Sequence, residues 1–412
     1  MNILLLGRWL PPPRHPLKTM REYQFARCLA REHRLTLAFI TDNPNASGPI
    51  SALRTEFGDL EFSVVPRGWK SLASVVRLAT GESCTLSYYR SEALRTRLAD
   101  RLRTRQYDLV FVSSSSMIQY ALEADAAIPL IMDFGDVDSE WWVRQAARGS
   151  FPGSRFLRIE ATRLRAAETA AAKRAARCLV TSSETGELVK SFAPDAPTTV
   201  IPNGVDVDSF APEPRRVPTL TVALNTDLAV EAQVRDAIEF RRSIMPIIRA
   251  RFPQARLVIV SKEASGTGQL AGDLTGLDVV APTPDVRSVL RCATVAVAPL
   301  RAAANVLSTV LEPMAAGVPV VATSEAAGRL TAAAGRDLLV ADGPEDFARK
   351  VIRLLEEPSL CAEVGARGRA FVSAQYAWSV MTARLSEVVQ AVVKPAPAGP
   401  SSEPEPLVEV RP

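Results

Sequence analysis

Short apolar runs alternate with longer segments of helical periodicity along most of the chain. A short apolar run between turn signals is typical of a strand that is buried on both faces of a parallel sheet, and the amphipathic segments are typical of the helices that cover it. The pattern therefore predicts an α/β protein built from repeated strand–helix units. We expect strands over residues 2–6, 35–40, 60–65, 108–112, 129–133, 178–182, 198–201, 219–224, 256–260, 279–280, 294–298, 318–322 and 338–340.

Segments of helical periodicity separate these strands. The first predicted helix follows Thr19, which forms a capping box with Glu22 three residues later. The Pro-, Ser- and Glu-rich residues 394–412 are expected to be disordered. We expect helices over residues 20–32, 90–105, 155–177, 231–252, 286–292, 305–316, 344–356, 360–375 and 376–393.

One strand–helix–strand unit, residues 294–322, contains an unusual carboxylate. Glu312 is the only charged residue in a predicted helix of apolar and small side chains. Gly317 follows that helix, where a C-cap favours a residue that adopts positive φ. Ligands of parallel sheets bind at the carboxyl ends of the strands, so Glu312 is a candidate ligand contact. The alternative is an ordinary charge at the solvent edge of the helix.

Composition narrows the class of protein. A chain of 412 residues is long enough for two domains, and a net charge of +4 is too small to indicate nucleic-acid binding. Five dispersed cysteines and two histidines give no disulfide framework and no His-rich metal site. The first residues read as a strand rather than a secretory leader, and no apolar run approaches the ~18–20 residues of a membrane helix. We expect a cytoplasmic protein, with peripheral contact to the inner face of the membrane as a further hypothesis.

The first half of the chain places polar residues after its predicted strands. Arg14, Lys18 and Arg21 follow the first strand and could meet an anionic group, although solvated loop charges are an equal alternative. Ser115 lies at a strand-to-helix junction, where it could contact a ligand or cap the helix.

Asp136 and Asp138 follow another strand and could recognise hydroxyl groups beside an aromatic platform. The alternative is that Ser139 or Asp138 caps the next helix and that Trp141 and Trp142 anchor the core, and both interpretations can hold.

Arginines gather on the predicted helix 90–105, and the helix 155–177 is also basic. Such a charge run is usually a solvated face. Contact with anionic lipid is the less common alternative, and it is the basis for the hypothesis of peripheral membrane contact.

Two motifs resemble those of a known family. Residues 312–321, Glu-Pro-Met-Ala-Ala-Gly-Val-Pro-Val-Val, resemble the nucleotide-sugar signature of retaining GT-B glycosyltransferases of family 4. Residues 201–206, Ile-Pro-Asn-Gly-Val-Asp, resemble the segment at which chains of that family cross between domains. Residues 136–142 resemble a segment of the subgroup of sugar transferases found beside exosortase and exopolysaccharide gene systems.

The resemblance implies the GT-B fold, with two Rossmann-like doubly wound domains that face a central cleft. It implies a first, acceptor-side domain over residues 1–205, a linker over 206–218, a nucleotide-sugar-binding domain over 219–375 and a returning helix over 376–393. It also implies retaining transfer from a nucleotide sugar, such as a UDP- or GDP-sugar, to a lipid-linked or glycan acceptor, without metal or cofactor. In the family the residue that matches Glu312 binds the ribose. The other implied donor-binding positions are Asn203, Gly204, Asn305, Ser308 and Thr309.

Several charged positions depart from the family pattern. Ala304 stands where the family usually has a sugar-binding Glu, and Thr309 stands where the subgroup has a Lys. The turn 224–229 has no Gly, Arg or Lys. Lys262 and Arg301 are the best substitutes for the cations that stabilise the departing diphosphate, and we predict a catalytic role for both. Two functions remain open: an active sugar transferase, and a degenerate relative that binds or assembles without catalysis.

Overall fold

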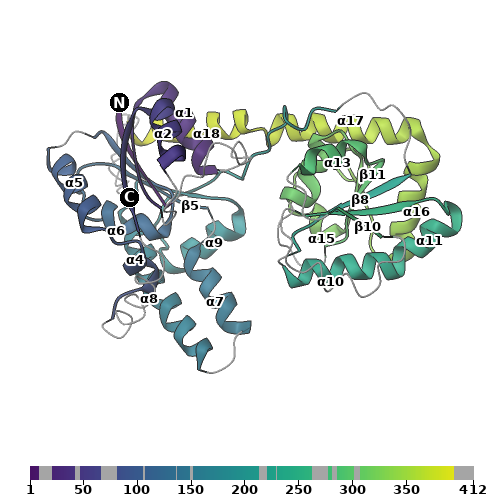
Figure 1. Cartoon of the computed structure of the whole chain (residues 1–412), viewed down its shortest axis with the longest axis horizontal. Helices are drawn as coiled ribbons and strands as arrows, with labels where there is room; N and C mark the ends of the chain where they lie inside the picture. The colour runs from purple at the N-terminus through teal and green to yellow at the C-terminus, as the bar shows by residue number, and fades with distance from the viewer. Residues whose placement is uncertain are drawn as a thin grey trace, which may run out of the picture. The chain divides into compact units, whose positions relative to one another are not determined.

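The computed structural model describes residues 1–8, 21–41, 47–65, 81–104, 107–135, 137–148, 152–212, 220–228, 230–261, 277–280, 285–300 and 307–393. The chain forms two compact units, shown in Figure 1. Unit 1 holds Met1–Pro202 and the chain from Met381 onward, and unit 2 holds Asn203–Val380. The expected class, two parallel-sheet α/β domains, is confirmed.

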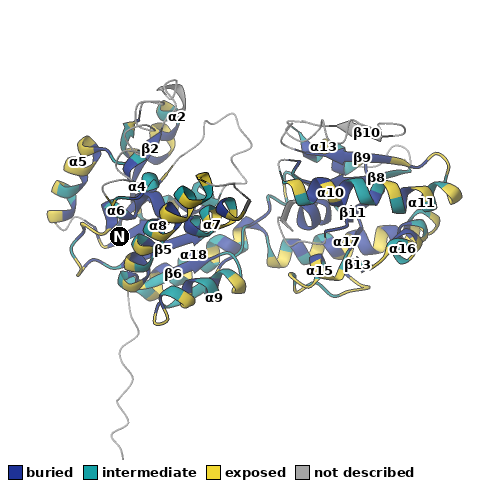
Figure 2. Ribbon diagram, turned by 90° about the horizontal axis from the view of Figure 1, so that it is seen from below, coloured by how far each residue is buried: buried dark blue, intermediate teal, exposed yellow. Residues whose placement is uncertain are grey.

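Unit 1 is built on a seven-stranded parallel sheet in the order β3-β2-β1-β4-β5-β6-β7. Its five interior strands are apolar and buried along most of their length, dark blue in Figure 2, whereas the edge strands β3 and β7 are mostly intermediate or exposed. The chain proceeds outward from β1 in one direction and from β4 in the other, so β1 and β4 flank the topological switch point. The strands are β1 (Asn2–Gly7), β2 (Arg34–Thr41), β3 (Asp59–Val64), β4 (Leu109–Val112), β5 (Leu130–Gly135), β6 (Arg177–Val180) and β7 (Thr198–Val200).

Helices cover both faces of this sheet. Side chains alternate between the faces of a strand, so Leu4 and Val110 pack beneath α5, α6, α8 and α9, while Phe111 meets Phe25 of α1 on the other face. The N-terminal half of α18 also lies on α1, where Cys28 contacts the Thr382 carbonyl oxygen at 3.5 Å. The helices are α1 (Arg21–Glu32), α2 (Ser47–Phe57), α4 (Cys84–Tyr88), α5 (Glu92–Arg103), η2 (Ser115–Met117), α6 (Ile118–Ala121), α7 (Asp138–Arg148), α8 (Gly153–Arg174), α9 (Ser183–Phe192) and α18 (Trp378–Val393).

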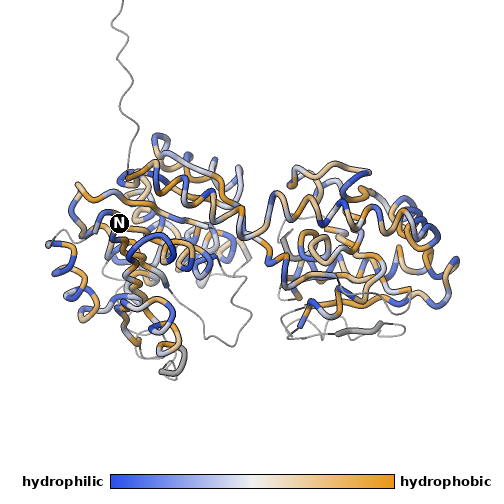
Figure 3. The backbone as a smooth tube through the Cα atoms, turned by 90° about the horizontal axis from the view of Figure 1, so that it is seen from above, coloured by the Kyte–Doolittle hydropathy of each residue, from blue (hydrophilic) through white to orange (hydrophobic). Residues whose placement is uncertain are grey.

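Unit 2 repeats the plan with a six-stranded parallel sheet in the order β10-β9-β8-β11-β12-β13, which places its switch point between β8 and β11. Its interior strands are largely buried, and Figure 3 colours the apolar stretches of the backbone orange and the hydrophilic stretches blue. The strands are β8 (Thr221–Asn225), β9 (Arg256–Val260), β10 (Leu277–Val280), β11 (Val295–Ala298), β12 (Val320–Ala322) and β13 (Leu339–Val340). The helical segments are α10 (Glu231–Glu239), η3 (Phe240–Ile244), α11 (Met245–Arg251), α13 (Val286–Cys292), η5 (Leu307–Leu311), α14 (Glu312–Ala315), α15 (Ser324–Ala327), α16 (Pro344–Glu356) and α17 (Pro358–Gln375).

Two predicted helices are not continuous α-helices. Residues 231–252 and the described part of 305–316 each contain a π-helical turn, η3 and η5. Each π turn ends two residues before a proline, Pro246 or Pro313. A proline inside a helix has no N–H and crowds the carbonyl four residues earlier, so the ladder shifts to a wider turn. Helix α2 was not predicted, because Gly48 and Pro49 at its start read as a turn.

The turn after α14 confirms the predicted role of Gly317. Its φ is +71°, and the N–H groups of Gly317 and Val318 donate to the carbonyls of Met314 and Pro313 at 2.9 and 3.1 Å. This is the Schellman pattern of a helix C-terminus. A Cβ atom on Gly365 of α17 would lie only 2.3 Å from the Gly317 carbonyl oxygen, so two backbones meet directly behind the turn.

Candidate functional site

The switch point of unit 2 holds Glu312. Asn225 is the last residue of β8, and its side-chain amide Nδ2 donates to Glu312 Oε2 at 2.8 Å. Both residues are buried, with exposed fractions of 3% for Asn225 and 5% for Glu312. A buried carboxylate needs hydrogen-bond donors, so the amide holds Glu312 in a fixed position between the ends of β8 and α14.

Side chains rather than glycines shape the turn after β8. Gln233 of α10 accepts from the Thr226 hydroxyl at 2.9 Å and from the Asp227 N–H at 2.8 Å. The Ser261 hydroxyl accepts from the Leu228 N–H at 3.3 Å. Sequence reasoning noted that this turn has no glycine but missed Asn225 and Gln233. The signal was available, because Asn225 is the first polar residue after an apolar strand.

The structure describes only some of the other residues that were predicted to bind the donor or the diphosphate. Thr309 is fully buried in η5. Asn203 and Gly204 begin unit 2, and a Cβ atom on Gly204 would lie 2.6 Å from the Trp378 ring, so this segment is closely packed. Arg301, Lys262, Asn305 and the side chain of Ser308 lie outside the described residues. The roles predicted for all of these residues stay predictions.

In unit 1 an ion pair fixes the ends of the central strands. Arg21 of α1 contacts both carboxylate oxygens of Asp133 in β5, at 2.8 and 3.0 Å. The same guanidinium donates to the carbonyl oxygen of Ile201 at 2.6 Å and lies over the Phe25 ring. The Arg21 side chain is 10% exposed and that of Asp133 is 2% exposed. Arg21 therefore joins α1, β5 and the end of the unit.

Glu22, the next residue of α1, lies at the switch point of unit 1. It is half-buried beside the ends of β1 and β4. Burial raises the pKa of its carboxyl to about 8, and the negative charges of Asp133 and Asp138 add to this rise. Arg8 and the Ser113 hydroxyl act in the opposite direction. The sequence analysis placed Glu22 only in a capping box with Thr19, which lies outside the described residues.

Ser115 contributes to a buried network on α8. Its hydroxyl donates to Glu168 Oε1 at 2.8 Å, and Glu168 also accepts from the N–H and the hydroxyl of Ser139. Burial raises the pKa of Glu168, and these hydrogen bonds oppose the rise. The fully buried Glu168 thus anchors the first turns of η2 and α7. Ser114 rather than Ser115 caps η2, because its hydroxyl accepts from the Ser116 N–H at 3.4 Å. The acceptor role predicted for Ser115 stays a prediction.

The remaining acceptor-side predictions are only partly described. Asp138 opens α7 and is half-buried, as expected for a residue near a helix start. Trp142 donates to the Thr85 hydroxyl at 3.2 Å, while Trp141 is 49% exposed. Arg14, Lys18 and Asp136 lie outside the described residues.

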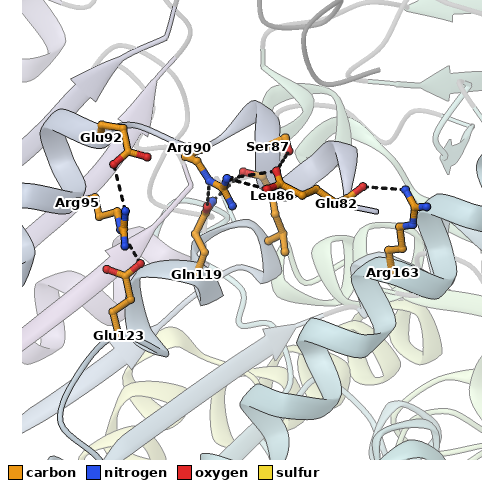
Figure 4. A network of polar contacts seen from close by, with 9 residues as sticks. All are labelled: Glu82, Leu86, Ser87, Arg90, Glu92, Arg95, Gln119, Glu123 and Arg163. Carbon is orange, nitrogen blue, oxygen red and sulfur yellow. Dashed lines mark hydrogen bonds and ion pairs between the residues drawn. The ribbon is translucent and has the colours of Figure 1, made fainter. Parts of the chain in front are cut away.

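Most arginines of the predicted basic helix form ion pairs. Figure 4 shows Arg90 between Glu82 and Gln119, and Arg95 between Glu92 and Glu123. Beyond the figure, Arg97 pairs with Glu61, Arg101 with Asp59 and Arg103 with Asp100. Carboxylates thus balance much of the positive charge of α5, which favours the solvated-face interpretation over lipid contact.

Within the described ranges, no set of three or more His, Cys, Asp or Glu side chains is placed to hold a metal ion. No helix in the same part of the chain is both long and apolar enough to span a bilayer.

Comparison with known families covers most of both units. Residues 21–209 match the model described as Glycosyltransferase Family 4, and residues 229–357 match that described as Glycosyl transferases group 1. The first half of the chain is thus similar to family 4 glycosyltransferases, and the second half is similar to group 1 glycosyl transferases. The second match includes Glu312 and begins four residues after Asn225. The first match includes Arg21 and Glu22. The family resemblance of the motifs is confirmed at this level.

The names of the curated relatives of this chain describe enzymes that act on lipids. It is 33% identical over 205 residues to a phosphatidyl-myo-inositol mannosyltransferase of Mycolicibacterium smegmatis, a match that covers 47% of this chain and 51% of that protein. It is 28% identical over 219 residues to a GDP-mannose-dependent monoacylated alpha-(1-6)-phosphatidylinositol monomannoside mannosyltransferase of Corynebacterium glutamicum, covering 46% and 55%. The chain thus spans about half the length of the curated relatives that it matches.

Solved structures share the fold of this chain across nearly its whole length. Anabaena HepE in complex with UDP and glucose has a TM-score of 0.61 at 15% identity, covering 94% of this chain and 99% of that one. Sucrose-phosphate synthase of Thermosynechococcus elongatus has a TM-score of 0.60 at 16% identity, covering 94% and 98%. These likenesses establish the GT-B type of fold.

Proposed function

We propose that the protein transfers a sugar from a nucleotide-sugar donor to a hydroxyl group of a lipid-linked or polysaccharide acceptor, with retention of configuration. We place this reaction in exopolysaccharide or cell-surface glycan synthesis. The observation that carries the proposal is the buried carboxylate of Glu312, held by Asn225 at the switch point of unit 2. The family matches and the names of the relatives support it.

Glu312 suits the recognition of a ribose. A carboxylate offers about four acceptor positions on two oxygens, and the Asn225 amide takes one of them. Vicinal hydroxyls of a nucleoside would donate to the same group. Because the side chain is already fixed, binding orders little further structure and loses little side-chain entropy.

Retention in this proposal requires no covalent nucleophile from the protein. The acceptor hydroxyl attacks on the face from which the nucleoside diphosphate departs, and the protein positions the two reactants and stabilises the diphosphate. We assign the stabilising role to Arg301 and Lys262. In the sequence Lys262 follows β9 and Arg301 follows β11, the strands on either side of β8.

The names of the relatives suggest the first substrates to test. GDP-mannose is the donor named for several of them, and phosphatidylinositol derivatives are the acceptors. HepE was solved with UDP and glucose, which makes UDP-glucose the second donor to test.

A second candidate function is a catalytically inactive relative that binds or assembles. The observation that favours it is the complete burial of Thr309 in η5, at the position where the subgroup carries a lysine. A neutral buried side chain cannot replace a cation opposite a diphosphate.

Calorimetric titration with UDP, GDP, UDP-glucose and GDP-mannose tests the proposal. We expect one nucleotide to bind, and Glu312→Ala to weaken it by roughly tenfold or more, about 1.4 kcal/mol or above. The exposed Glu363→Ala on α17 is the matched control and should bind like the wild type. Absence of binding by all four compounds would contradict the proposal.

Turnover separates the two candidate functions. Incubation of the same protein with the bound donor and phosphatidylinositol, followed by NMR of the product, reports both transfer and anomeric configuration. A retained configuration supports the proposal, an inverted one contradicts retention, and binding without any transfer favours the inactive relative.

A further inference from the structure

Glu22 and Ser113 lie on opposite sides of the switch point of unit 1. Gly7 ends β1, and a Cβ atom on it would be 3.8 Å from Glu22 Oε2, so the carboxyl lies against the end of that strand. Ser113 directly follows β4, and its N–H donates to the Leu6 carbonyl oxygen of β1 at 2.9 Å. The two side chains thus meet where the carboxyl ends of two diverging strands leave a crevice in this class of sheet.

The neighbouring polar groups are already engaged. Asp133 accepts two bonds from Arg21 and one from the Gly135 N–H at 3.2 Å. The hydroxyls of Ser114 and Ser116 pair at 2.9 Å. Among the described residues, the buried Ser113 hydroxyl, in a residue only 8% exposed, lies within reach of the Glu22 carboxyl, whose pKa it lowers, but forms no well-aligned hydrogen bond. A buried hydroxyl and a half-buried carboxyl that do not fully satisfy each other indicate a place for a ligand hydroxyl.

The surroundings of Glu22 keep its carboxyl neutral near pH 7. Burial is the main cause, and Asp133 from β5 and Asp138 from α7 add to it, so the pKa rises to about 8. Arg8 after β1 opposes the rise but is exposed, and Arg21 on the same helix is paired with Asp133. A neutral carboxyl has one donor and further acceptor positions, which match a hydroxyl group on both counts.

We propose that Glu22 and Ser113 form a binding site for a hydroxyl group of a neutral polyol or sugar, and that this group belongs to the acceptor. The assignment to the acceptor rests on the proposed function. Binding expels the remaining water from Glu22 and strengthens the repulsion from the two aspartates. The site therefore binds its ligand in the neutral form of Glu22 and loses affinity as that group ionises.

Ligand-observed saturation-transfer NMR with glycerol, myo-inositol and methyl α-D-mannopyranoside tests this site. At about pH 6.5 we expect at least one of the three to bind the wild type, and Glu22→Ala and Ser113→Ala each to weaken it roughly fivefold or more. Glu22→Gln keeps both a donor and an acceptor and should bind within about twofold of the wild type.

The pH dependence distinguishes ligand contact from a purely structural role. At about pH 9.5 the wild type should bind roughly fivefold more weakly than at pH 6.5, while Glu22→Gln keeps its affinity because it does not ionise. Glu32→Gln, an exposed carboxylate at the other end of α1, is the matched control and should follow the wild type at both pH values. Thermal melting of each variant checks that it is folded.

Three results would overturn the site: no polyol binds the wild type, Glu22→Ala binds as the wild type does, or affinity rises with pH. Titration of UDP and GDP on the same samples separates the two proposals. If a nucleotide binds and the polyol results fail, only this inference falls. If the polyol results hold and no nucleotide binds, the site stands and its assignment to a glycosyl acceptor falls with the proposed function.

Discussion

Each switch point of this molecule holds a glutamate, Glu22 on the helix after β1 and Glu312 on the helix after β11, and the two glutamates have different surroundings. Glu312 in unit 2 faces the neutral amide of Asn225. The carboxyl of Glu22 in unit 1 has a raised pKa, mainly because it is buried; Arg8 and the Ser113 hydroxyl lower that pKa, and Asp133 and Asp138 raise it. The amide of Asn225 fixes one glutamate by a hydrogen bond, whereas burial beside two aspartates favours the neutral acid of the other. The fold places a carboxyl at each switch point, and the surroundings of that carboxyl decide how it can contact a ligand.

The largest expected effect comes from removing the ion pair that supports the unit 1 switch point. Arg21→Ala leaves Asp133 buried without its cation and also removes the bond to the Ile201 carbonyl. We expect a loss of about 3–5 kcal/mol in the free energy of unfolding, measured by urea denaturation. Arg103→Ala on α5, which removes an exposed ion pair, is the control and should cost less than about 1 kcal/mol. Equal losses of unfolding free energy in both variants would show that the buried ion pair stabilises the protein no more than the exposed one does.

Close backbone packing supports the helix that carries Glu312 in unit 2, whereas a buried ion pair supports the switch point of unit 1. A Cβ atom on Gly365 would lie 2.3 Å from the Gly317 carbonyl oxygen, so Gly365→Ala must displace α17 or the turn after α14. We expect a destabilisation of about 3 kcal/mol and weaker nucleotide binding, since the same turn ends the helix that carries Glu312. Gly335→Ala is the control for any glycine loss, because its Cβ would meet nothing within 4 Å, although its φ of +79° costs about 1 kcal/mol. A Gly365→Ala variant no less stable than this control would show that the helix shifts freely.

A second carboxyl next to Glu312 would give the unit 2 site acidic neighbours like those of Glu22, and so tests the comparison. Asn225→Asp places a second carboxyl against Glu312, as Asp133 and Asp138 stand near Glu22. At neutral pH the two carboxylates should repel each other, so nucleotide affinity should fall by roughly thirtyfold, about 2 kcal/mol, and should recover in part near pH 5, where the pair takes up a proton. Titration calorimetry at both pH values measures this.

Asn225→Ser is the matched control for that exchange, since it shortens the side chain without adding charge. It should lose affinity to a similar extent at both pH values. If Asn225→Asp showed no recovery at low pH, charge repulsion would not be the cause of its loss.

Much of the fold followed from the apolar pattern, because strands buried on both faces read as short continuous runs. The position of Glu312 and the positive φ of Gly317 were also predictable from residues on either side of them. Side-chain partners far apart in sequence were not. The bond from Asn225 to Glu312 spans 87 residues, and that from Arg21 to Asp133 spans 112. No local pattern reports which charged residue meets which.

Glu168 is a second residue whose partners could not be predicted from the sequence. In the sequence it is one acidic residue in a basic, Ala-rich helix, and such a residue normally faces water. It is instead fully buried, because Ser115 and Ser139 donate to it from the ends of two other segments. The serines were recognised as capping candidates, but the carboxylate that they share was not, since only the folded arrangement brings all three together.

The smallest expected effect concerns the stability of unit 1 against pH. The pKa of Glu22 is about 8 in the folded protein and near 4.5 in an unfolded chain, so the folded state binds the extra proton between these values. The stability that this proton provides is complete below about pH 4.5 and is lost as pH rises through about 8. Glu22→Gln removes this dependence, so its unfolding free energy relative to the wild type should rise by about 1–2 kcal/mol between pH 5 and pH 9. We expect less than the full shift implies because the half-buried side chain keeps contact with water. Glu32→Gln should show no such rise, and a flat difference for Glu22→Gln would mean that Glu22 is ionised in both states and that the two switch points do not differ as described.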